Sequence, residues 1–542
     1  MTARSVGFRW KKASAALLSV LLSVLILPLS GCKKDTPEGK NFRFPLSAEP
    51  RQIDPQVSTD AASVTMVAAL FEGLARLDEA GEAVPAAANW TVSDDGLTYT
   101  FTLRESKWND GTPVTAQDFL FGIQRAVLPS TKSALAEQLF VIKGAKAVNE
   151  GTAELSSLGV TAPDEKTLVI TLTEPDAAFP AKTASTPYMP CNKVFFEKTN
   201  GRYGLEVEYI LSNGPFFLKR WNHNENLLLN KNEGYADADS ILPAAVRYMI
   251  GEVDDPVTQL KNDLLDAAPI PADSLDAARE AGLTLTPLED TIRTLWMNNG
   301  NEALKNVRIR RALRDALEWG TIAAQLDEAA APAEGYAAPA AVLSGAERYR
   351  TGENALSPEP DREGAVLGLK AGLREAGLSK MPRLTLLCAE DEYSLNLARY
   401  VVQSWQKNLS LYFDIEAVSA SELETRVKVG NYQLALYACS APGPAALDAF
   451  GTFSSEGTGN YARFSDSAVD QAVDDALLGG TNREEMEALE TLLWEKCPSV
   501  PLSVEKRYIG IPANDSGIIV RPFGGGAFGA PYDFRYAGKL DD

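Results

Sequence analysis

Few side chains in this 542-residue sequence have the type and spacing that catalysis requires. His223 is the only histidine, so zinc peptidase motifs with two histidines are excluded, and a Ser/His/Asp triad has one possible base. It lies in Trp-Asn-His-Asn-Glu-Asn, between apolar stretches, which indicates an exposed hairpin turn. No GxSxG elbow or EF-hand spacing occurs. We therefore expect no enzymatic activity, no metal site and no cofactor.

The cysteines are also too few to build a disulfide scaffold or a cysteine-rich metal fold. After Cys32, the sequence holds only Cys191, Cys388, Cys439 and Cys497, far apart and without a CxxC motif. Two alternatives stay open for these four residues. They are buried small hydrophobic side chains, or two of them form one disulfide.

The charge balance argues against a nucleic-acid partner. The chain has 52 Lys and Arg against 73 Asp and Glu, a net charge of −21, whereas phosphate binding needs clustered cations. With 45% hydrophobic and 23% charged residues, the composition is that of a globular protein. The negative charge keeps such a protein in solution and favours cationic ligands.

The N-terminal segment has the pattern of a secretion signal. Residues 1–31 carry four cations and no acid, followed by an apolar run that ends at Leu-Ser-Gly-Cys, residues 29–32. This ending resembles the bacterial lipobox, which implies cleavage before Cys32 and diacylation of that residue. Cleavage would take the net charge from −21 to −25. The alternative is an uncleaved membrane anchor, for which the run is short.

Periodicity in the remaining sequence predicts a mixed α/β organisation. Residues 98–103 alternate strictly and predict a strand, residues 61–77 predict a helix, and Thr115 with Asp118 form a capping box. A strand, a helix and a strand at 384–388, 394–407 and 411–418 predict a right-handed βαβ unit. Further strands are expected at 167–172, 227–230, 246–250, 432–437, 501–508 and 517–521, a helix at 306–319, and an Ala-rich surface loop at 321–345.

Several sequence blocks follow one another in a characteristic order. The longest, residues 90–125, contains Lys-Trp-Asn-Asp-Gly-Thr-Pro-Val-Thr-Ala-Gln-Asp-Phe, and the shorter blocks are residues 49–55, 70–74, 162–164, 213–216, 298–299, 306–313 and 533–536. Together these blocks resemble the family 5 extracellular solute-binding proteins. That family comprises the oligopeptide- and dipeptide-binding receptors of ABC importers. The resemblance covers the chain from about residue 42 to 540.

The resemblance implies an α/β fold of the periplasmic-binding-protein-like type II. Such a protein has two lobes, three domains, a hinge and an interlobe ligand cleft. The expected division is 1–31 signal peptide, 32–41 tether, 42–80 first part of domain I, 81–185 domain II, 186–285 second part of domain I, 286–504 domain III and 505–542 C-terminal part of domain I.

The resemblance also implies that a peptide is bound in the cleft, extended against strand edges, and is delivered to an ABC permease. The residues expected at the cleft are Glu49, Pro50, Arg293, Leu295, Trp296, Tyr437, Ala438, Cys439 and Ser440. Arg293 would pair with a ligand carboxylate or lie on the surface. Trp296 and Tyr437 would stack on the ligand or belong to the core.

One position departs from the family pattern. Oligopeptide receptors have an aromatic-x-x-Asp segment whose Asp pairs with the α-amino group of the ligand, and here Tyr437 is followed by Ser440 in the Asp position. A neutral serine cannot form that charge-assisted bond. Either another acid, with Asp448 and Glu49 as candidates, meets the amine, or the ligand has no free amine there.

Other ligands and roles remain open within the same fold. The ligand could be a nickel chelate, a sugar, an opine or haem, or the protein could be a surface sensor or chaperone without transport. We expect a monomer anchored to the bilayer through Cys32, on the extracytoplasmic face of either a Gram-positive or a Gram-negative envelope.

Overall fold

The computed structural model describes residues 41–324, 326, 330–343, 347–356, 361–457, 459–479, 482–523 and 531–539. They belong to one unit, Gly39–Asp542. The expected signal peptide, Cys32 and residues 33–40 of the tether lie outside the described residues, whereas Asn41 already begins a strand. Within the described ranges, no helix is long and apolar enough to cross a membrane.

One sheet joins the start of the described chain to its middle. Its strand order is β1-β10-β9-β8, with β1 (Asn41–Leu46), β10 (Ala245–Ile250), β9 (Asn226–Lys231) and β8 (Phe216–Asn222). Strand β1 runs parallel to β10, although about 200 residues separate them, and Phe42, Phe44 and Leu46 on one face of β1 are buried. The strands expected at 227–230 and 246–250 are confirmed.

A second sheet contains the longest sequence block. Its order is β4-β5-β7-β6, with β4 (Ala88–Val92), β5 (Thr98–Leu103), β7 (Thr167–Thr171) and β6 (Val160–Thr161). The alternation of β5 is confirmed. Helix α3 (Ala116–Val127) packs near it, and Trp108 is buried beside the helix and donates from Nε1 to Oδ2 of Asp118, at 3.2 Å. Asp118 also accepts from the backbone N–H of Thr115, which confirms the capping box.

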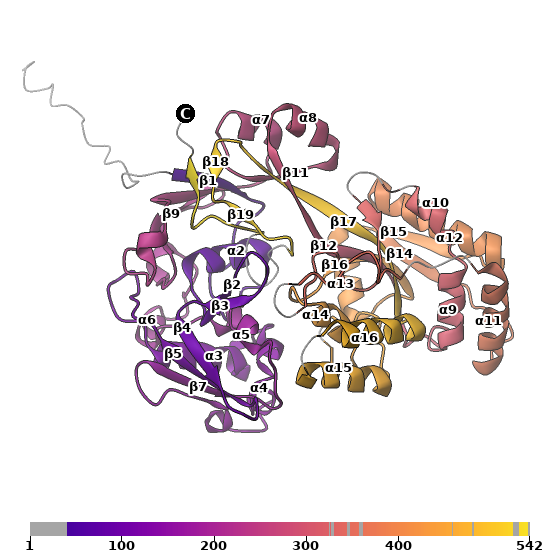
Figure 1. The fold of residues 1–542 in the computed structure, drawn as a ribbon, viewed down its shortest axis with the longest axis horizontal. Helices are drawn as coiled ribbons and strands as arrows, with labels where there is room; N and C mark the ends of the chain where they lie inside the picture. Colours follow the sequence, from indigo (N-terminus) through magenta and orange to yellow (C-terminus); the bar gives the residue numbers. More distant parts are fainter. Residues whose placement is uncertain are drawn as a thin grey trace, which may run out of the picture. The chain divides into compact units, whose positions relative to one another are not determined.

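A third sheet has the order β11-β17-β12-β16-β14-β15, and β13 pairs with β17. Its strands are β11 (Ala268–Ile270), β17 (Ser499–Ile511), β12 (Thr284–Met297), β16 (Leu434–Ser440), β14 (Thr385–Ala389), β15 (Asp414–Val418) and β13 (Ala330–Pro332). Figure 1 shows β12 and β17 side by side between β11 and the strands β14 and β15, and their antiparallel register shifts between Leu288 and Thr291. The expected domain limits at 285 and 504 fall within these two continuous strands, so the division stays a prediction.

Helices cover both faces of this third sheet. One core holds side chains of α9 (Val307–Asp315), α11 (Arg362–Glu375) and α12 (Glu392–Leu409), with Leu386 of β14. The neighbouring residue Leu387 points into the opposite core, formed by α13, α14, α15 and α16. Their bounds are α13 (Ala420–Val429), α14 (Ala446–Gly451), α15 (Ser467–Gly479) and α16 (Arg483–Lys496). The parallel pairing of β14 and β15 around α12 confirms the predicted βαβ unit.

Several local predictions are wrong, and one is the helix expected at 306–319, where α9 ends at Asp315 and a separate helix begins at Trp319. Helix α2 (Ala61–Leu70) ends seven residues before the expected end, and residues 75–77 form β2. The helix ends because the side chain of Asn213, distant in sequence, accepts from the N–H and donates to the C=O of Glu72, at 3.1 and 2.9 Å. The expected loop 321–345 contains the end of α10 (Trp319–Ala323) and all of β13.

The remaining elements are short. They are β3 (Ala83–Pro85), α4 (Ala145–Asn149), α5 (Phe179–Lys182), α6 (Lys193–Lys198), α7 (Pro256–Lys261), α8 (Leu275–Glu280), β18 (Asp515–Ser516), β19 (Ile519–Val520), β20 (Tyr532–Asp533) and β21 (Gly538–Lys539).

Candidate functional site

Most of the predicted ligand-contacting residues lie together where β12, β16 and β17 meet. Across the β12–β16 ladder, Arg293 lies opposite Ala438, Ile292 opposite Cys439, and Thr291 opposite Ser440. Ser440 is the last residue of β16 and is exposed. We give the name strand crossing to residues 289–293 and 503–507, in the middle of β12 and β17, together with residues 437–440 at the end of β16.

Strand β16 has one free edge at this crossing. On the side of β14 its pairing covers only Leu434 and Ala435, opposite Leu386 and Leu387. The residues from Leu436 to Ser440 continue beyond that pairing, and within the described part of the chain no strand covers this edge. Tyr437, Ala438 and Cys439 are only half-buried. The crossing therefore has a strand edge without a pairing strand among the described residues, which an extended ligand can use as a ladder partner.

Asp290 supplies a carboxylate beside the exposed end of β16. Its side chain is 8% exposed. Oδ1 accepts from Nη2 of Arg507 at 2.7 Å and from Oγ1 of Thr291 at 3.0 Å. Oδ2 faces the hydroxyl of Ser440 at 3.4 Å, a long contact. The acid missing from the Ser440 position is thus present on the neighbouring strand.

Asp290 was missed because its nearness to Ser440 depends on strand register. The two residues are 150 positions apart in sequence. A charged residue inside the alternating segment Thr-Leu-Thr-Pro-Leu-Glu-Asp-Thr was the available signal. The expected substitutes have other contacts: Asp448 accepts from the N–H of Ala445 at the start of α14, and burial raises its pKa.

Glu49 is held by the β8–β9 hairpin. Its carboxylate accepts from Nε1 of Trp221 at 2.7 Å and from the N–H of Asn224 at 2.8 Å, and it contacts Nδ1 of His223 at 2.6 Å. Pro50 beside it is buried. These contacts give Glu49 a role in fixing the hairpin, and they confirm that His223 lies in a turn.

Arg293 is mostly buried and paired within the chain, and its buried Nε has no hydrogen-bond partner among the described residues. Its side chain is 13% exposed and forms an ion pair with Glu505, while Nη1 donates to the hydroxyl of Ser394 at 3.0 Å. The guanidinium also lies 5.1 Å from the ring centre of Tyr393. The carboxylate that Arg293 binds is therefore one from this chain.

The predicted aromatic residues differ in their surroundings. Trp296 is buried, stacks on Phe453, and donates from Nε1 to the carbonyl of Tyr437 at 3.1 Å. Tyr437 is half-buried, with its ring edge-on to Tyr461. Leu295 is fully buried in the core formed with α9, α11 and α12. Trp296 and Leu295 therefore support the strands, whereas Tyr437 retains exposed surface.

The four cysteines after Cys32 form no disulfide. Cys191, Cys388, Cys439 and Cys497 are all free thiols, and Cys439 is the one that is only partly buried. Burial raises the pKa of Cys388 to about 11 and that of Cys439 to about 12. Both thiols are therefore protonated at neutral pH and unreactive as nucleophiles.

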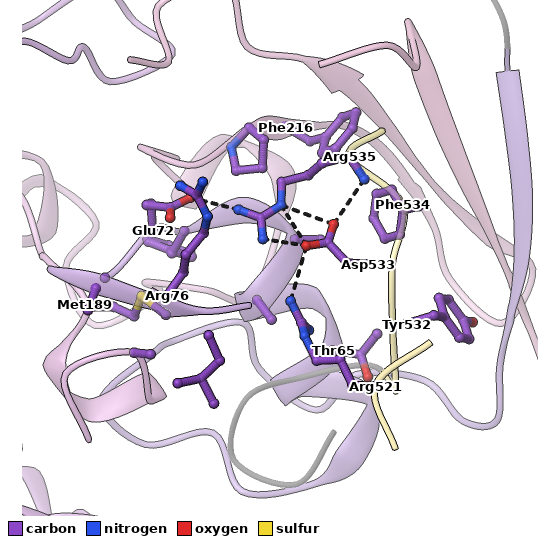
Figure 2. A pocket seen from close by; sticks show the side chains of 18 of the residues that line it. Thr65, Glu72, Arg76, Met189, Phe216, Arg521, Tyr532, Asp533, Phe534 and Arg535 are labelled. Atoms are coloured by element: carbon purple, nitrogen blue, oxygen red, sulfur yellow. Dashed lines mark hydrogen bonds and ion pairs between the residues drawn. The ribbon is translucent and has the colours of Figure 1, made fainter. Parts of the chain in front are cut away.

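A cavity of about 80 Å³ lies apart from the predicted residues, and none of them lines it. Its charged walls are Glu72, Arg76, Arg521, Asp533 and Arg535. Figure 2 shows the guanidinium groups of Arg521 and Arg535 approaching the Asp533 carboxylate from different sides. Its apolar walls include Phe71, Leu77, Met189, Phe216 and Tyr532.

Comparison with known proteins identifies the class. The substrate-binding domain of an oligopeptide ABC transporter from Bacillus anthracis str. Ames superposes with a TM-score of 0.73 at 25% identity, over 93% of this chain and 100% of that one. Together with the mixed sheets and helices, this likeness defines a type II periplasmic-binding-protein fold and confirms the expected α/β class. A model of the bacterial extracellular solute-binding proteins, family 5, matches residues 83–461.

The chain belongs to the bacterial extracellular solute-binding proteins, family 5. The oligopeptide-binding protein OppA of Bacillus subtilis (strain 168) is 31% identical over 439 residues, 76% of this chain and 79% of that protein. The probable deoxycholate-binding periplasmic protein YgiS of Escherichia coli (strain K12) is 27% identical over 489 residues, 86% and 90% of the two chains. Membership of a receptor family confirms that the protein is a binding protein and not an enzyme.

Proposed function

We propose that this protein is a peptide receptor that binds its ligand at the strand crossing and delivers it to the permease of an ABC importer. The observation that carries the proposal is the free edge of β16 at Leu436–Ser440, with the Asp290 carboxylate beside its end. Similarity to OppA of Bacillus subtilis supports a peptide as the ligand.

The geometry suits a peptide for two physical reasons. Backbone hydrogen bonds along a strand edge do not depend on the sequence of the ligand, so one edge accepts many peptides. A carboxylate at the end of the edge can accept a charge-assisted bond from the α-ammonium group. Asp290 therefore takes the place that the family pattern gives to an acid at Ser440. Of the predicted cleft residues, we retain Tyr437, Ala438, Cys439 and Ser440.

The surrounding functions are proposed from the sequence and the family. Diacylation of Cys32 would hold the protein, as a monomer, at the extracytoplasmic face of the membrane. The three-domain division, with closure about the β12 and β17 strands, supplies the ligand-dependent change that a permease can recognise.

A binding titration tests the proposal. Calorimetry would compare a pentapeptide with a free amine, the same peptide acetylated at its N-terminus, and deoxycholate, the compound in the name of the YgiS relative. We expect the free peptide to bind, and the acetylated peptide to bind more weakly. Binding of deoxycholate with no binding of mixed peptides would overturn the peptide assignment.

A further inference from the structure

The cavity beside Arg521 contains more cationic than anionic side chains. Three arginines and two acids line it, Arg76, Arg521, Arg535, Glu72 and Asp533. This excess is notable in a chain whose net charge is −21. A buried cation without a matching anion is costly, so each guanidinium in the wall needs a neutralising partner.

Both acids in the cavity wall are already in use. Asp533 accepts from Nη2 of Arg521 at 3.1 Å and from Nε of Arg535 at 2.9 Å. Glu72 accepts from the hydroxyl of Tyr235 at 2.8 Å and lies 3.7 Å from Nη1 of Arg535. Two carboxylates are thus shared between Arg535 and Arg521.

The third arginine has no acid to itself. Arg76 lies 3.7 Å from Asp237. The Asp237 carboxylate, however, already accepts two hydrogen bonds from the guanidinium group of Arg104, at 2.8 and 3.0 Å. Including Arg104 and Asp237, four guanidinium groups share three carboxylates. One positive charge around the cavity is left uncompensated by these described partners.

Arg521 also has an unused donor. Its side chain is 11% exposed, and Nε is buried with no hydrogen-bond partner among the described residues. Burial of a donor without a partner costs free energy that a bound acceptor would recover. The same burial lowers the pKa of Arg521, as expected for a cation short of anionic neighbours.

We propose that this cavity is a carboxylate-binding site in which Arg521 and Arg76 hold the anion. A planar carboxylate matches the guanidinium fork, and the apolar walls strengthen the interaction by excluding water. The carboxylate comes either from a small free acid or from the C-terminus or acidic side chain of a bound peptide, and the second source rests on the proposed function. The residue after Arg521 connects the cavity to the crossing, because the carbonyl of Pro522 accepts from the N–H of Glu289 at 3.2 Å.

Nuclear magnetic resonance of the arginine Nε–H groups tests the site without any peptide. The Arg521 signal is identified as the one lost from the Arg521→Lys variant. We expect acetate to shift this signal in a saturable way in the wild-type protein. Arg104→Lys is the matched control, because Arg104 belongs to the same charge network but does not line the cavity. In that variant acetate should still shift the Arg521 signal.

Peptide titrations distinguish the two sources of the carboxylate. If the peptide supplies it, a C-terminal amide should bind about tenfold more weakly than the free acid to the wild-type protein and to Arg104→Lys, and equally well to Arg521→Lys. If a small free acid supplies it, acetate shifts the Arg521 signal while amidation has no effect. Absence of the acetate shift together with absence of an amidation effect would overturn the site. Failure of all peptides to bind would count against the proposed function, and the acetate shift would still decide the cavity.

Discussion

The two oxygens of Asp290 have different partners, and this difference matters for binding. Oδ1 is fixed by Arg507 and Thr291, whereas Oδ2 has the long contact to Ser440. The first oxygen holds the side chain in place, and the second is positioned to accept from a ligand. Such preorganisation reduces the entropy that binding would otherwise cost.

Replacement of Asp290 by asparagine should weaken the binding of peptides with a free amine by about tenfold, because a charge-assisted bond becomes a neutral one. Binding of N-acetylated peptides should not change. Calorimetry with the two peptides measures the difference, and Glu289→Gln on the same strand is the control. Equal losses for both peptides would show that Asp290 only stabilises the fold.

His223 gives the protein a pH dependence near neutrality. Nε2 contacts Glu206 at 3.1 Å and Nδ1 contacts Glu49 at 2.6 Å, so both ring nitrogens can donate only when the ring is protonated. These hydrogen bonds raise the pKa of His223 above the usual histidine value of 6.5. The stability they contribute is fully present below about pH 6.5 and is lost as pH rises through the raised pKa.

The difference in melting temperature between the wild-type protein and His223→Gln, followed from pH 5 to pH 9, isolates this effect. The wild type should be the more stable protein at low pH, and the difference should shrink as pH rises. Burial raises the pKa of Asp515 to about 6. This residue titrates in both proteins, so its contribution cancels in the difference between their melting temperatures. A difference that does not vary with pH would contradict the role of His223.

At the scale of elements, the sequence was informative wherever the pattern was local. The alternation of β5 and the capping box of α3 depend on residues a few positions apart, so both were predicted correctly. The end of α2 and the position of Asp290 depend on partners about 140 to 150 residues away, Asn213 and Ser440. No local pattern contains such partners, which explains both the wrong helix end and the missed acid.

The blocks at 70–74 and 213–216 meet in space, and Gly214 makes their contact possible. A Cβ at Gly214 would lie 2.8 Å from the backbone carbonyl of Leu70. Gly214→Ala should therefore lower the free energy of unfolding by about 1–3 kcal/mol, as overpacking does. Thermal and denaturant unfolding measure the change.

Gly320→Ala provides the matched control for this prediction. A Cβ there has open space around it, within α10. We expect a gain of up to about 1 kcal/mol from the better helix propensity of alanine. If both substitutions changed the free energy of unfolding equally, the close approach of the two blocks at Gly214 would not be the cause of the destabilisation.

At the scale of the whole molecule, the resemblance of residues 29–32 to a lipobox predicts a lipid anchor at Cys32. If Cys32 is diacylated as we propose, Cys32→Ser should move the protein from the membrane to the soluble fraction, because the thiol that would carry the lipid is removed. Metabolic labelling with palmitate and cell fractionation measure this change. Cys439→Ser, at a partly buried free thiol, is the control and should remain in the membrane fraction. Unchanged membrane association of Cys32→Ser would instead support an uncleaved anchor.

The family as a whole was predictable because its motifs extend over most of the chain, from residue 49 to 536. The ligand was not predictable from the sequence, because the strand crossing and the cavity are assembled from residues far apart in the chain. The central claim is that the ligand is a peptide. Native mass spectrometry of the protein from residue 33 onward, purified without denaturation, tests it most directly. We predict a ladder of co-purified peptide masses of mixed sequence, whereas a single non-peptide mass, or empty protein that shows no thermal shift with peptide pools, would contradict the claim.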